Sequence, residues 1–77
     1  MKVKIELLGL LHIKGVANNS FIDLTEGATI TDVYNKLNIL KDHQKFIIPF
    51  INGNEVRKSA QVNDGDTVKI FLPTGGG

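Results

Sequence analysis

The 77-residue chain has no cysteine, no tryptophan and only two prolines. The lack of cysteine excludes disulfides, thiolate metal ligands and a thiol nucleophile. A small domain without disulfides or a metal depends on a well-packed core of regular elements. The hydrophobic content of 42% must provide that core, and the length allows one domain.

Long stretches of one charge are also missing. Nine basic and eight acidic residues give a net charge of +1, and the basic residues are spread from Lys2 to Lys69. Nucleic-acid-binding proteins instead concentrate basic residues in a patch. No apolar run approaches the length of a membrane helix, and residues 1–4 begin an alternating pattern rather than a signal sequence. We therefore expect a cytoplasmic protein that binds neither nucleic acid nor membrane.

Apolar residues alternate with polar ones over positions 2–8 and again over positions 67–72. A period of two is typical of a strand with one buried face. We expect these two strands to lie side by side and parallel, because the connection between them must be a right-handed crossover. Positions 22–24 predict a further short strand that forms a hairpin with the first.

Thr29 and Asp32 have the spacing of a capping box, which predicts that a helix begins there and ends near Asn38. Its apolar stripe at i, i+3 and i+7 consists of Ile30, Val33 and Leu37. Tyr34 lies beside this stripe, and we expect it at the rim of the core.

The apolar run at positions 46–51 predicts another strand, but it contains Pro49. Proline has no N–H to donate to a ladder, so we expect an edge strand or an unpaired position. Asn52 and Gly53 then predict a type I′ turn and a brief return strand at positions 55–57. The predicted fold class is α+β, with a mixed sheet of four to five strands and one main helix packed across one face.

The sequence ends with Thr74 followed by three glycines. Glycine has no Cβ, so such a segment can enter a narrow channel and bring its carboxylate close to another protein's chemistry. Fully extended, residues 73–77 would reach roughly 17 Å. We expect residues 1–72 to form the domain and residues 73–77 to form a flexible tail that ends in the carboxylate of Gly77. A mobile terminus without a function is the alternative reading of the tail alone.

The predicted element order, the segments 24–29, 51–53 and 64–66, and the closing glycines together resemble the ubiquitin-like β-grasp sulfur carriers of the MoaD/ThiS family. The resemblance covers nearly the whole chain. It implies a β-grasp fold for the domain.

Two features favour the molybdopterin synthase small subunit (MoaD) branch over the thiamine-thiazole (ThiS) branch. These are the sequence Phe71-Leu72-Pro73 before the tail and the pair Leu8-Gly9 near the end of the first strand. The family usually ends in two glycines, which correspond to Gly76 and Gly77 here, so Gly75 is an additional glycine.

The resemblance also implies a chemistry. An ATP-dependent activating enzyme of the MoeB/ThiF type would adenylate Gly77, and attack by sulfur would give a thiocarboxylate. Gly75 and Gly76 would lie in the partner's channel. The sulfur would pass to an acceptor enzyme such as the molybdopterin synthase large subunit or thiazole synthase. The chain itself would be a protein cosubstrate rather than an enzyme, with no bound cofactor.

Phe71 is expected to face away from Ile70, and we predict that Phe71 and Pro73 dock a partner, since aromatic residues are enriched in interfaces. Packing of Phe71 on a neighbouring strand is the alternative. His12 and His43 are isolated, so no metal site is predicted.

Two other functions remain open. In the first, the chain is a ubiquitin-like modifier that is conjugated through Gly77 to lysines of target proteins. In the second, it is a β-grasp interaction module with an inert tail.

Overall fold

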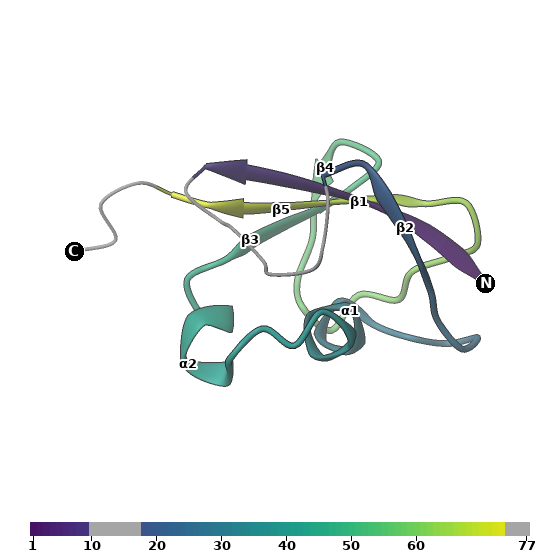
Figure 1. Cartoon of the computed structure of the whole chain (residues 1–77), viewed down its shortest axis with the longest axis horizontal. Helices are drawn as coiled ribbons and strands as arrows, with labels where there is room; N and C mark the ends of the chain where they lie inside the picture. The colour runs from purple at the N-terminus through teal and green to yellow at the C-terminus, as the bar shows by residue number, and fades with distance from the viewer. Residues whose placement is uncertain (10–17, 74–77) are drawn as a thin grey trace.

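The computed structural model describes residues 1–9 and 18–73. The elements in chain order are β1 (Lys2–Gly9), β2 (Ser20–Asp23), α1 (Ile30–Lys36), α2 (Lys41–Gln44), β3 (Ile48–Ile51), β4 (Asn54–Glu55) and β5 (Thr67–Leu72). The five strands form one mixed sheet in the order β2-β1-β5-β3-β4, and both helices lie on the same side of it (Figure 1).

The first and last strands are central neighbours, as predicted. β1 and β5 run parallel, with Ile5 opposite Val68 and Leu7 opposite Ile70. β2 pairs antiparallel with β1, which confirms the predicted hairpin. The sheet with its crossing helix confirms the predicted β-grasp architecture.

α1 begins at the predicted capping box. The Asp32 carboxylate accepts a hydrogen bond from the Thr29 backbone N–H at 2.8 Å, and the Asp32 N–H donates to the Thr29 hydroxyl at 3.4 Å. These bonds satisfy N–H groups that the first turn of a helix leaves without partners. The helix ends at Lys36, and Asn38 then takes a positive φ of 60°, which asparagine tolerates better than most residues.

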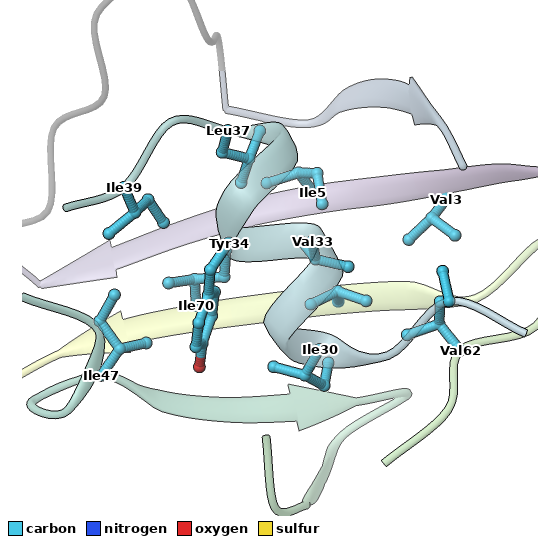
Figure 2. Close-up of a cluster of buried hydrophobic side chains, with 12 residues drawn as sticks. Val3, Ile5, Ile30, Val33, Tyr34, Leu37, Ile39, Ile47, Val62 and Ile70 are labelled. Carbon is cyan, nitrogen blue, oxygen red and sulfur yellow. The ribbon is translucent and has the colours of Figure 1, made fainter. Parts of the chain in front are cut away.

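The core lies between the sheet and the helices, and the predicted stripe on α1 is fully inside it (Figure 2). Tyr34 is only 1% exposed, so it lies within the core rather than at its rim. Fully burying a Val, Leu or Ile side chain contributes about 1.5–3 kcal/mol, so this cluster is the main source of stability. Its members are Val3, Ile5, Ala28, Ile30, Val33, Tyr34, Leu37, Ile39, Ile47, Val62, Val68 and Ile70.

Of the two alternatives expected for Pro49, the edge strand is wrong, whereas the unpaired position agrees with the side of β3 to which its nitrogen points. β3 lies between β5 and β4, and Pro49 is opposite Ile70 of β5. The N and C=O of one strand residue point to the same side, and the Pro49 carbonyl accepts from the Val56 N–H at 3.0 Å. The Pro49 nitrogen therefore points away from β5, toward the side on which β4 lies. Its position is beyond the two residues of β4 that pair with β3. The β3–β5 ladder loses no donor.

α2 is a helix that the sequence did not predict. It has four residues, which is too short to show a helical period. In the chain, α2 comes between α1 and β3. In space, it lies beside the end of the sheet at which β5 finishes (Figure 1).

Candidate functional site

The candidate site begins where β5 leaves the sheet. Leu72, the last residue of β5, packs partly buried against the core, and the half-buried Pro73 is the last residue that the structure describes. The predicted tail residues Gly75, Gly76 and Gly77 lie outside the described residues. The end of β5 therefore sets the point from which the tail starts.

Three apolar side chains from three strands lie in one row at this point. In the register, Phe71 of β5 is opposite Leu8 of β1 and Ile48 of β3. Val68 and Ile70 face the core, so Phe71 must face the opposite side of the sheet, because side chains alternate along a strand. We call Leu8, Ile48 and Phe71 the outer strip.

Both helices cover the core side of the sheet (Figure 1), so the outer strip, whose side chains alternate with core residues, faces away from the helices. Leu8 is 43% exposed, whereas Phe71 and Ile48 are half-buried by their neighbours. Phe71 thus packs on adjacent strands and also presents part of its ring to solvent. An apolar strip of this kind, beside the exit of a tail, has the composition of an interface centre.

The next row of the same face is mixed in character. Lys69 is opposite Glu6 of β1 and Phe50 of β3. On this face of the sheet, the apolar outer strip beside the tail is therefore followed by a row that carries two opposite charges. Such a border can orient a partner, because charges at the rim of an interface contribute more to specificity than to affinity.

The sequence analysis found Phe71 but missed Leu8, Ile48 and Phe50 as members of this face. A signal was present, because the runs 7–8 and 46–51 place apolar residues on both faces of their strands. A strand with one wet face would place polar residues at half of these positions.

The described part of the chain offers no catalytic constellation. It holds no group of three or more His, Asp or Glu residues that could bind a metal ion. His43 is exposed on α2, and His12 lies outside the described residues. The burial of Tyr34 raises the pKa of its phenol to about 12, which leaves it neutral and enclosed in the core.

An open hollow of about 590 Å³ lies between the end of β2 and α1. Two of its charged groups are already engaged. The Lys2 ammonium donates to Asp23 at 2.9 Å and lowers the pKa of that carboxyl, and the Asp32 carboxylate caps α1. The hollow therefore presents no pair of free carboxylates for acid–base catalysis.

Comparison with protein families identifies the family of the chain. A model of the ThiS family matches residues 10–77, which is most of the chain and includes its last residue. The chain belongs to the ThiS family. It is a MoaD/ThiS-like β-grasp protein, as the sequence resemblance predicted. No curated protein sequence gives a significant match.

Solved structures agree with this assignment. SAMP1 from Haloferax volcanii superposes with a TM-score of 0.78 at 20% identity, over 100% of both chains. A putative molybdopterin converting factor subunit 1 from Pyrococcus furiosus gives 0.71 at 27% identity, over 95% of this chain and 98% of that one. Subunit 1 in a complex of subunits 1 and 2 of the molybdopterin-converting factor from Helicobacter pylori gives 0.67 at 21%, over 100% of both. These similarities establish the β-grasp fold.

Neither α1 nor α2 is long and apolar enough to cross a membrane, and these are the helices within residues 1–9 and 18–73.

Proposed function

We propose that the chain is a sulfur carrier whose C-terminal carboxylate is activated and converted to a thiocarboxylate. The observation that carries this proposal is the match to the ThiS family, because it extends through Gly77 and so includes the glycine tail. The outer strip supports it, since an exposed apolar row stands where β5 releases that tail.

The chemistry requires activation by another protein. An α-carboxyl group has a reference pKa of about 3.3–3.7, so it is ionised at neutral pH and is a poor electrophile. Attack of the Gly77 carboxylate on ATP gives an acyl-adenylate and releases pyrophosphate. A hydrosulfide ion then attacks the carbonyl carbon, the C–O bond to AMP breaks, and a thiocarboxylate remains after AMP and a proton leave. The chain has no cysteine, so the sulfur comes from a partner.

The chain's own contribution is positioning. Phe71 and Pro73 lie at the base of the tail, and we assign them to docking, together with Leu8 and Ile48 of the outer strip. Docking of a rigid sheet face fixes where residues 74–77 begin, which reduces the entropy cost of placing Gly77 at a reaction centre. The ATP-dependent partner is of the MoeB/ThiF type.

Molybdopterin synthesis is the pathway that we place first, with thiamine thiazole second. The structural neighbours from Pyrococcus furiosus and Helicobacter pylori are described as molybdopterin converting factor subunits, and the latter is in complex with subunit 2. By analogy, the acceptor of the sulfur is an enzyme subunit that binds the outer strip. The chain is then a small subunit of a sulfur-transfer complex rather than an enzyme.

The test measures ATP-dependent adenylation by the cognate activating enzyme. We expect the wild-type chain to be adenylated, and Gly76→Val to lose about 100-fold in rate, because a β-branched side chain misplaces the reacting carbon by about 1 Å or more. A C-terminal alanine extension, which moves the carboxylate by roughly 3.4 Å, should fail similarly. Thermal melts should be unchanged. Equal adenylation of all three proteins contradicts the proposal.

A second candidate is a ubiquitin-like modifier. It is favoured by the similarity to SAMP1, which a second structure calls small archaeal modifier protein 1. Conjugation would use the same activated Gly77 but transfer it to a lysine amine. Because Lys69 is the last basic residue, trypsin would leave residues 70–77 as a branched remnant on the target lysine. Detection of that remnant distinguishes the modifier from the carrier.

A further inference from the structure

Exposed apolar side chains are concentrated around the exit of the tail. In the part of the chain that the structure describes, four large hydrophobic residues are exposed: Leu8, Phe21, Leu40 and Phe46. Leu8 belongs to the outer strip. Leu40 and Phe46 flank α2, on the helical side of the sheet, and no step of the proposed function yet uses them.

The register places the α2 segment beside the tail. Ile48 is opposite Phe71, so the residues just before Ile48 reach the end of the sheet from which the tail leaves. Leu40 follows the buried Ile39, and Phe46 precedes the buried Ile47. Both isoleucines lie at the end of the core toward which β1 and β5 point (Figure 2). In Figure 1, α2 lies at the end of the molecule at which β5 finishes.

The segment is held firmly in this position. The buried Gln44 amide donates from Nε2 to the Ile39 carbonyl at 2.8 Å and to Asn35 Oδ1 at 3.1 Å. The Phe46 N–H donates to the His43 carbonyl at 3.1 Å, which closes the turn after α2. Leu40 and Phe46 are therefore exposed although the backbone that carries them is fixed.

The surroundings of Phe46 indicate what kind of surface it fits. The Lys45 ammonium lies 5.5 Å from the centroid of the Phe46 ring, within the range of a cation–π contact. Lys41 is exposed on the same segment, and Asp42 is the one acidic residue between Leu37 and Ile51. A partner that covers Phe46 must therefore also meet a positive charge, and an acidic group is the complement.

We propose that Leu40, Lys45 and Phe46, which we call the α2 surface, form a second docking site for the ATP-dependent activating enzyme. The enzyme would hold the base of the tail from two sides, with the outer strip on one side and the α2 surface on the other. Its matching region is an apolar depression with a carboxylate near Lys45. This inference rests on the proposed function, and it names the activating enzyme because every reaction at Gly77 begins with activation.

The test uses full-length chains and measures KM and kcat for adenylation by the cognate activating enzyme. The double variant Leu40→Ser, Phe46→Ser should raise KM roughly 10-fold with little change in kcat. Truncating these two side chains weakens binding to the enzyme but does not affect the chemical step in the bound complex. The fold should tolerate the change. Leu40 is the N-cap residue of α2 and makes no side-chain cap bond, and serine is a favourable N-cap.

Phe21→Ser is the matched control. Phe21 is 65% exposed, the same as Leu40, but it is opposite Lys4 of β1, away from the Phe71 end of the sheet. We expect its KM to equal that of the wild type. An effect of Phe21→Ser as large as that of the double variant would mean that any lost apolar residue weakens binding, and it would overturn the proposal.

The charge is tested separately with Lys45→Glu. Lys58→Glu is its control, because Lys58 is also exposed but lies in the turn that contacts the beginning of α1. We expect a KM increase for Lys45→Glu alone, and this increase should shrink at high salt. Wild-type adenylation with unchanged KM in all α2 variants overturns this inference and leaves the proposed function intact. If the wild-type chain is not adenylated, both the proposed function and this inference are overturned.

Discussion

Leu37 and Leu40 are the same residue type, three positions apart, with opposite surroundings. Leu37 is 4% exposed and completes the core, whereas Leu40 is 65% exposed beside α2. The same contrast separates Ile70, which is fully buried, from its neighbour Phe71, which faces away from the helices. Within residues 1–9 and 18–73, two sets of apolar side chains can thus be distinguished, and the exposed Phe21 belongs to neither. One set stabilises the fold, and the other surrounds the exit of the tail and is available to a partner.

The largest effect on stability should come from the first set. Leu37→Ala should lower the free energy of unfolding by about 2–5 kcal/mol, because it leaves a cavity in the core. Leu40→Ala should change it by no more than about 0.5 kcal/mol, as expected for a surface position. Urea denaturation of both variants checks this prediction. Equal losses would show that the two leucines do not belong to different sets.

Gln44 links the two sets, because its buried amide fixes the segment that exposes Leu40 and Phe46. Gln44→Ala removes the donor to the Ile39 carbonyl, and an unsatisfied buried acceptor costs about 1–3 kcal/mol. We expect a loss in this range, together with faster hydrogen exchange of the Phe46 and Ile47 amides. If exchange at these amides is unchanged, the α2 segment is held by something other than this side chain.

A smaller effect should appear at alkaline pH and arise from Tyr34. Its phenol ionises near pH 10 when unfolded, but burial raises the folded-state pKa to about 12. The unfolded state therefore loses this proton first. The contribution of the neutral phenol to the free energy of unfolding is fully present below about pH 10. It decreases between pH 10 and 12, by at most roughly 1.4 kcal/mol per pH unit.

Tyr34→Phe provides the control for that titration. The Tyr34 hydroxyl is buried without a hydrogen-bond partner within the described residues, so its removal should leave stability at pH 7 equal or slightly higher. The decline between pH 10 and 12 should become shallower in the variant. Parallel pH profiles for both proteins would show that other groups cause the decline.

Local sequence patterns predicted much of the fold. The capping box at Thr29 and Asp32 located the start of α1, and alternation identified β1 and β5 with their inward residues. These predictions succeeded because each depends on neighbours in sequence. Pro49 misled the assignment of β3, because its effect depends on which strand its nitrogen faces, and that is set by the tertiary arrangement.

The candidate site was less accessible to such reasoning. Phe71 could be placed by alternation, but its row with Leu8 and Ile48 depends on the registers of two strand pairs that are distant in sequence. α2 was missed because four residues cannot show a helical period. The exposure of Leu40 and Phe46, which flank this helix, was missed for the same reason. The roles of Gly75, Gly76 and Gly77 stay predictions, since these residues lie outside those that the structure describes.

The central claim is that Gly77 carries sulfur. Its most direct test is the mass of the C-terminal tryptic peptide, residues 70–77. The chain for this measurement is produced in its native cell, so that the cell's own enzymes can modify it. The downstream acceptor enzyme is deleted from that cell. Our account predicts a fraction of this peptide in which one oxygen has been replaced by sulfur. An unmodified peptide in every molecule, or the same eight residues found only as branches on lysines of other proteins, would contradict it.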